Sequence, residues 1–168
     1  HSSGGGMTMQ MACSRPDALA GIAVVATKVL LNAPCADQRT PVPAVFFYGT
    51  ADELNPHAGR SDPANPRDAK LGLSYSAVES IAIWQRRNGC GAPAERHIDP
   101  TDDGVSVTRF DYSGCTAPLR YFEVTGGGHA IPGTKLRRSL IPRDVPEVAV
   151  KDIDAMAEAL RFFLRTAG

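Results

Sequence analysis

The sequence has no excess charge of either sign and no long hydrophobic run. Its 168 residues carry 18 basic and 18 acidic side chains, so the formal net charge is zero. A balanced charge removes the electrostatic attraction that nucleic-acid binding requires, so we expect no nucleic-acid partner. The longest apolar candidate, residues 18–26, has less than half of the roughly 20 residues that cross a bilayer. We therefore expect no membrane partner either.

Cysteine is also scarce, and its spacing argues against a metal site. The four cysteines, Cys13, Cys35, Cys90 and Cys115, form no C-x-x-C pair of the kind that binds zinc. This spacing disfavours a zinc site, and we expect no metal. We expect no cofactor either. An even number of cysteines is compatible with two disulfides in an oxidising compartment or with four buried, reduced thiols. The first residues are not a basic and then apolar leader, so the secretion that we expect would need a leader outside this sequence.

The remaining composition is that of one globular domain over residues 1–168. Hydrophobic residues make up 43% of the chain and charged residues 21%, which is enough apolar material for a core. Short apolar runs, typical of strands buried on both faces, alternate with helical patterns. This alternation predicts an α/β fold with a mainly parallel sheet flanked by helices. The expected strands are residues 21–26, 44–48 and 119–124, and the expected helices are residues 5–15, 76–88 and 152–165.

Three local patterns add detail. Ser76 and Glu79 have the spacing of a capping box, which predicts a helix start. Residues 95–98 and 105–112 flank a turn-rich stretch and predict a hairpin, whereas the proline-rich segment 55–67 predicts a loop. In the last helix we expect one stripe to face the core. Its members are Ile153, Met156, Ala157, Leu160, Phe163 and Leu164.

Three polar residues stand beside these elements in an order that suggests chemistry. Ser3 precedes the first helix, Asp52 follows the second strand, and His129 follows the third. Serine, acid and histidine in this chain order are what a catalytic triad on a parallel sheet requires. The glycines at 4–6 allow a sharp turn beside the serine, and the helix that starts there directs N–H groups towards an oxyanion. Read singly, Asp52 could instead cap a turn and His129 could lie on a surface loop.

Six short motifs in this order resemble the catalytic half of the polyhydroxybutyrate depolymerase and feruloyl esterase family of α/β hydrolases. They are Ser-Gly-Gly-Gly-Met at 3–7, Arg-Pro-Asp at 15–17, Gly-Thr-Ala-Asp at 49–52, Asn-Gly-Cys at 88–90, Tyr-Ser-Gly-Cys at 112–115 and Gly-Gly-Gly-His at 126–129. The resemblance runs nearly end to end. It implies the α/β-hydrolase fold for the whole chain.

The resemblance also implies roles for single residues. Ser3 would be the nucleophile, Asp52 the acid and His129 the general base, with the Gly4 N–H as one oxyanion-hole donor. It further implies a disulfide between Cys90 and Cys115. We add the expectation of a second disulfide between Cys13 and Cys35.

The sequence departs from the family pattern in two ways. The family has glycine two residues before the nucleophile, and with Ser3 in that role the position is His1. The family domain is also larger, with strands before the nucleophile and a second oxyanion donor, so we expect an N-terminally incomplete domain that needs a further segment to complete the fold. The opening His-Ser-Ser-Gly also resembles a polyhistidine-tag remnant, and in that case Ser3 would not be native.

The expected function is that of a secreted serine carboxylesterase. The resemblance implies feruloyl or acetyl esters of plant polysaccharide, or a short-chain polyhydroxyalkanoate, as the ester substrate, and the sequence does not choose between them. Two alternatives stay open. One is a serine peptidase of the same fold, and the other is a catalytically inactive fragment or binding module.

Overall fold

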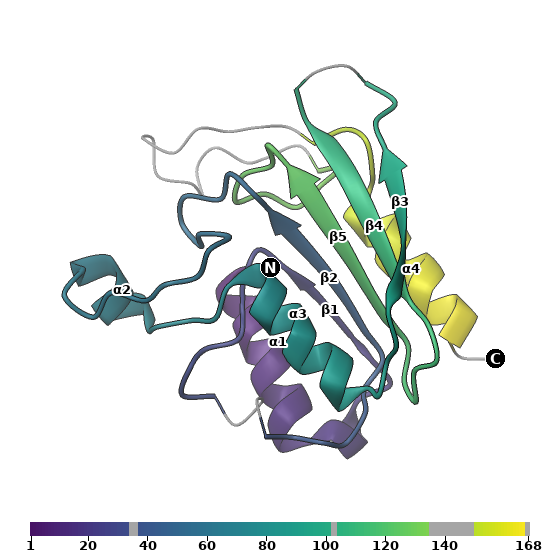
Figure 1. The fold of residues 1–168 in the computed structure, drawn as a ribbon, viewed down its shortest axis with the longest axis horizontal. Coiled ribbons are helices and arrows are strands. Elements are labelled where there is room, and N and C mark those ends of the chain that lie inside the picture. Colours follow the sequence, from purple (N-terminus) through teal and green to yellow (C-terminus); the bar gives the residue numbers. More distant parts are fainter. Residues whose placement is uncertain (34–36, 102–103, 135–149, 167–168) are drawn as a thin grey trace.

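The computed structural model describes residues 1–33, 37–101, 104–134 and 150–166. Helices lie on both sides of a five-stranded sheet whose strand order is β1-β2-β5-β4-β3 (Figure 1). The strands are β1 (Ile22–Val25), β2 (Ala44–Gly49), β3 (Pro93–Ile98), β4 (Ser106–Tyr112) and β5 (Leu119–Thr125). The helices are α1 (Ser3–Ser14), α2 (Pro66–Leu71), α3 (Ala77–Arg87) and α4 (Ala155–Thr166), with a short 3-10 turn at Pro16–Ala18.

The sheet is mixed. β1 pairs with β2 and β2 with β5 in parallel, whereas β5 pairs with β4 and β4 with β3 antiparallel. The expected hairpin is confirmed as β3 and β4. The sheet is less parallel than predicted, because the hairpin and its attachment to β5 are two of the four strand pairings. All six residues of β2 are buried, in keeping with its central place and its continuous apolar sequence. The arrangement is compatible with an α/β fold.

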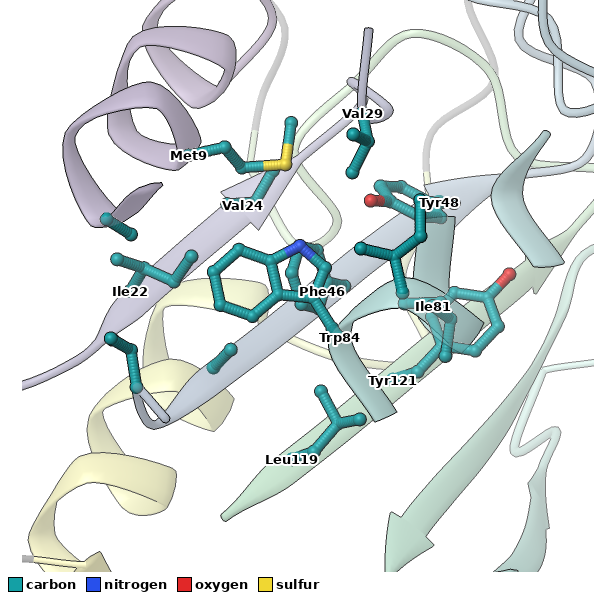
Figure 2. Packing of buried hydrophobic residues seen from close by; sticks show 14 of the residues in the cluster. Met9, Ile22, Val24, Val29, Phe46, Tyr48, Ile81, Trp84, Leu119 and Tyr121 are labelled. Carbon is teal, nitrogen blue, oxygen red and sulfur yellow. The ribbon is translucent and has the colours of Figure 1, made fainter. Parts of the chain in front are cut away.

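Two hydrophobic cores lie on opposite faces of the sheet because successive strand residues point to opposite sides. Phe46 of β2 packs against Trp84 of α3, with ring centroids 5.3 Å apart, in the core that α1 also covers (Figure 2). Phe47, the next residue, stacks on Phe122 of β5 at 4.7 Å, on the face that α4 covers. α1 and α3 thus lie on one face and α4 lies on the other.

The structure confirms the predicted start of one helix and shows a further helix that the sequence did not predict. The capping box is present at the start of α3, where Ser76 and Glu79 accept each other's backbone N–H groups. The predicted loop at 55–67 ends in a helix start, because Pro66 begins α2 behind the Asn65 cap. Among the described residues, no helix combines the length and apolar character that crossing a bilayer would require.

The predicted core stripe of the last helix is wrong in three of its six members, whereas Ile153 is buried as predicted and Ala157 and Phe163 are partly buried. α4 begins at Ala155 and buries Ala155, Ala159 and Phe162, whereas three predicted core residues are largely exposed. These are Met156, Leu160 and Leu164. Ala155, Ala159 and Phe162 belong to the core on this face of the sheet. Burial therefore follows this stripe and leaves the bulkier one outside.

Candidate active site

The turn before α1 holds a serine in a strained backbone conformation. Ser2 has φ 52° and ψ −127°, in the region that side-chain-bearing residues rarely adopt. Such a residue carries strain on the order of 1–3 kcal/mol and persists only where its surroundings fix it. Here the Ser2 N–H donates to the Val25 carbonyl at the end of β1, at 2.9 Å. The turn is thereby tied to the sheet.

Of the three glycines at the helix start, Gly5 is the one whose lack of a side chain the packing requires. A Cβ atom on Gly5 would lie 2.8 Å from Thr27 Cγ2, whereas one on Gly4 would meet no atom within 4 Å. Gly5 therefore lets α1 rest directly on the segment that follows β1. The prediction that small residues surround the serine holds for a reason that the sequence did not reveal.

The acid lies on the turn after β2. Asp52 is buried, and its Oδ1 accepts hydrogen bonds from the backbone N–H groups of Leu54 and Asn55, at 3.0 and 2.8 Å. An aspartate that accepts from N–H groups two and three residues further on forms an Asx turn, which fixes its side chain. The carboxylate is thereby held with Oδ2 available to a second partner.

The histidine connects the other two residues. His129 follows β5, and its Nδ1 lies 2.9 Å from Asp52 Oδ2 and 3.1 Å from Oδ1. Its Nε2 lies 2.9 Å from Ser2 Oγ. Because an ionised carboxylate can only accept, a neutral imidazole places its proton on Nδ1 and leaves Nε2 to accept from the serine hydroxyl. A continuous hydrogen-bond chain thus runs from Ser2 through His129 to Asp52.

The structure brings Asp52 and His129 together as predicted, but it corrects the serine. The hydroxyl that contacts His129 belongs to Ser2, and Ser3 is already the first residue of α1. The positive φ that aims the hydroxyl falls on Ser2, and sequence spacing could not place it because Ser2 and Ser3 are both followed by glycine two positions later. One signal was available. With Ser2 as the nucleophile, His1 no longer occupies the position where the family has glycine.

The same shift of one residue changes the predicted oxyanion donor. An α/β hydrolase takes one donor from the backbone N–H of the residue after its nucleophile, which with Ser2 in that role would be Ser3 instead of Gly4. The N–H groups of Gly5 and Gly6 donate to the carbonyls of His1 and Ser2, so the backbone ladder of α1 begins at Gly5. The Ser3 N–H precedes that ladder and lies at the helix start, where a developing negative charge is favoured.

A cavity of about 560 Å³ opens beside the serine. Ser2, Ser3 and His129 form part of its lining. Most of the other contacts are apolar, from Met7, Met9, Val29, Leu30, Leu54 and Leu71. A mostly apolar cavity with a few convergent polar groups is the usual form of a small-molecule binding site.

Two buried cations lie in the same cavity wall, and the sequence analysis missed both. Lys28 and Arg60 are 1% and 5% exposed. Burial lowers the pKa of Lys28 to about 8, with Arg60 adding to the effect and the charge of Asp52 opposing it. Burial also lowers the pKa of Arg60, against the opposing charges of Asp68 and Asp52. No sequence pattern marks these residues, because their burial comes from contacts with distant segments.

The disulfide that the resemblance implied is present. Cys90 and Cys115 are bonded, and this bridge joins the end of α3 to the segment between β4 and β5. The expected partner of Cys13 is Cys35, which lies outside the described residues, so that bridge stays a prediction. Among the residues that the structure describes, no three histidine, cysteine or acidic side chains gather as a metal site would need.

Comparison with known proteins gives relatives of one kind. The chain is 32% identical over 143 residues to NocK of Nocardia uniformis, which is named as an esterase. It is 32% identical over 135 residues to feruloyl esterase D of Neurospora crassa and 24% identical over 129 residues to a feruloyl esterase C of Aspergillus clavatus. All three relatives are named esterases. No protein-family model matches the chain.

These similarities cover most of this chain but less than half of each relative. The aligned regions span 77–80% of the chain, and the chain spans about 40% of the length of the relatives. The similarity supports an esterase family and is consistent with a carboxylic ester hydrolase. The resemblance to polyhydroxybutyrate depolymerases stays a prediction.

Proposed function

We propose that the protein hydrolyses carboxylic esters, with Ser2 as the nucleophile. The observation that carries this proposal is the hydrogen-bond chain from Ser2 Oγ through His129 to Asp52, with distances of 2.9 Å at both links. His129 is the general base, and Asp52 orients the imidazole and stabilises its charged form. The esterase names of the relatives support the same chemistry.

The geometry suits a two-step mechanism through an acyl-enzyme. Ser2 Oγ attacks the ester carbonyl carbon while its proton moves to His129 Nε2. When the carbon–oxygen ester bond breaks, the leaving alkoxide takes that proton and departs as an alcohol. Water then attacks the acyl-enzyme, again giving a proton to His129. The new bond forms the carboxylic acid, and Ser2 regains its hydroxyl proton.

The tetrahedral intermediate in each step carries an oxyanion, for which we propose the Ser3 N–H as one donor. The favourable field at the start of α1 acts in the same direction. A single donor is half of the usual oxyanion hole, and removal of one donor typically reduces the rate about 10²- to 10³-fold. The relatives are about two and a half times as long as the matched region, and β1 pairs only with β2 among the described residues. We propose that a further segment supplies the second donor beside β1.

We propose an ester with an apolar or aromatic acyl group as the substrate. The cavity beside Ser2 is lined mainly by methionine and aliphatic side chains, which suit a flat, apolar acyl chain. Two of the relatives are named feruloyl esterases, and ferulate is such a group. Acetyl esters and short-chain polyhydroxyalkanoates are the other members of the proposed range. The Cys90–Cys115 disulfide supports an oxidising, extracellular site of action.

Matched serine variants test the nucleophile. We expect a fluorophosphonate probe to label Ser2 and the protein to hydrolyse p-nitrophenyl acetate and methyl ferulate. Ser2→Ala should lose labelling and at least about 10³-fold in kcat. Ser3→Ala, which keeps the backbone N–H, should retain both. Loss of labelling in Ser3→Ala with undiminished activity in Ser2→Ala would refute the assignment.

Substrate choice needs a separate comparison. The kcat/KM values for methyl ferulate, an acetylated oligosaccharide and a hydroxybutyrate oligomer should be measured with the same enzyme preparation. We expect the largest value for methyl ferulate, since its aromatic acyl group has the greatest apolar area to bury in the cavity. A larger value for the hydroxybutyrate oligomer would reject the aromatic acyl group and keep the esterase mechanism.

A further inference from the structure

A buried lysine that the proposed mechanism does not use lies beside the acid turn. Lys28 follows β1, and its ammonium group donates a hydrogen bond to the backbone carbonyl of Asn55. The same Nζ lies 5.3 Å from the centre of the Tyr48 ring, a cation–π distance. An ammonium group is seldom buried unless it is paired. These two contacts are therefore the compensation for removing Lys28 from water.

Asn55 connects this lysine to the catalytic acid. Its backbone N–H donates to Asp52 Oδ1 at 2.8 Å, and its side-chain amide donates to the Ala26 carbonyl at 2.9 Å. Its side-chain oxygen accepts from Arg60 at 2.8 Å. Asn55 is thus held at its carbonyl by Lys28 and at its amide by two other segments. Its N–H is one of the two groups that fix the Asp52 carboxylate.

We propose, on the basis of the esterase function above, that Lys28 is a positioning residue for the triad. Its charged ammonium holds the Asn55 carbonyl. Through Asn55 it keeps the Asp52 carboxylate in the position from which it accepts a hydrogen bond from His129. Lys28 does not touch the reacting atoms, so its effect passes through the acid. Arg60 also holds Asn55 in place, by donating a hydrogen bond to its side-chain oxygen.

The charge of Lys28 gives this role a pH dependence. The charged groups that face it are Asp52 and Arg60, and the Tyr48 ring is neutral across the working range because burial raises the pKa of its hydroxyl. Since burial brings the pKa of Lys28 to about 8, its ammonium loses its proton as the pH rises through that value. The charge-assisted bond to Asn55 is then replaced by a weaker, neutral one. A triad alone needs only a neutral histidine, so activity that falls above pH 8 would come from another group.

Two substitutions of Lys28 separate charge from shape. In the wild type we expect kcat to fall above a midpoint near pH 8. Lys28→Met should reduce kcat at pH 7 by about 10- to 100-fold with little change in KM, and should have no such alkaline fall. Lys28→Arg keeps a charge that does not titrate, so its alkaline fall should move above pH 10. Lys151→Met removes an exposed lysine and should behave as the wild type.

Thermal unfolding of each variant at pH 7 checks that the fold is kept. Retention of the alkaline fall in a folded Lys28→Met or Lys28→Arg protein would overturn the proposal, as would unchanged kcat in Lys28→Met.

A second measurement does not depend on activity. The NMR signal of the His129 Nδ1 proton reports its hydrogen bond to Asp52, and we expect it to shift or broaden in Lys28→Met but not in Lys151→Met. An inactive, unlabelled wild type would reject the esterase function alone. An imidazole signal unchanged by Lys28→Met would reject the positioning role even in that case.

Discussion

The backbone just before the acid turn touches the backbone just before His129, and the contact is made at a glycine. Gly49→Ala is therefore a sharp test of how the site is assembled. Gly49 is the last residue of β2, and a Cβ atom there would lie 2.2 Å from the Gly127 carbonyl oxygen. Ordinary contact begins at 3.4 Å, so one of the two backbones must move by about 1.2 Å. Backbone atoms cannot rotate away as a side chain would, and Gly127 lies two residues before His129.

Gly49→Ala should lower both the activity and the stability of the protein. A displacement of about 1 Å would stretch the 2.9 Å bond between His129 and Asp52 beyond hydrogen-bond range, and misplacement of this size typically costs about 10²-fold in rate. The steric conflict should lower the free energy of unfolding by about 1–3 kcal/mol. Urea denaturation and kcat/KM for methyl ferulate measure the two effects.

A matched control for Gly49→Ala comes from an exposed glycine outside the site. At Gly91 the nearest atom to an added Cβ, the Ser113 carbonyl oxygen, is at an ordinary 3.4 Å. Gly91→Ala should therefore leave kcat/KM unchanged. If Gly49→Ala kept wild-type stability and kcat/KM, the close crossing of the two loops could not be what sets the triad geometry.

Two further predictions concern stability. The Cys90–Cys115 bridge closes a separation of 25 residues, so replacing both cysteines by serine should lower the free energy of unfolding by about 2–4 kcal/mol in urea titrations, and an unchanged midpoint would contradict this. Lys28 should make the protein more stable as the pH rises from 8 to 9.5. Unfolded lysine keeps its pKa of 10.5 while folded Lys28 has one of about 8, so in this window the unfolded chain binds more protons. We expect a gain of about 1–2 kcal/mol in the wild type and none in Lys28→Met; equal pH dependence in the two proteins would show that Lys28 does not titrate in this window.

The sequence predicted the central strands well because their apolar runs leave few alternatives. Residues 44–48 are continuously hydrophobic, and β2 is buried throughout its length. The last helix was harder, since Leu160 and Leu164 favour one stripe by hydrophobicity alone. Its actual buried face depends on how closely the Ala155 and Ala159 positions approach the sheet, and that distance is a property of the whole fold.

The sequence predicted that Asp52 and His129 lie together, as they do in the structure, but it named Ser3 where the structure has Ser2 in contact with His129. Asp52 and His129 each follow a strand of the parallel part of the sheet, so their meeting follows from the topology. The choice between Ser2 and Ser3 depends on a single positive φ at Ser2, and serine does not favour a positive φ at either position. Lys28 and Arg60 could not be predicted, because a charged side chain that becomes buried has the same local sequence as one on the surface.

The opposite signs expected for stability and activity at alkaline pH have a common origin. The charged form of Lys28 is unfavourable in the fold, since burial lowers its pKa, and yet that form makes the stronger bond to Asn55. Loss of the Lys28 proton should therefore raise the free energy of unfolding and, at the same time, weaken the bond that holds the turn around Asp52. The strained backbone of Ser2, at the other end of the hydrogen-bond chain, also lowers the stability of the fold. Both features reduce stability, and both act on residues to which we assign a role in the proposed mechanism, so substitutions that relax either one should give a more stable and less active protein.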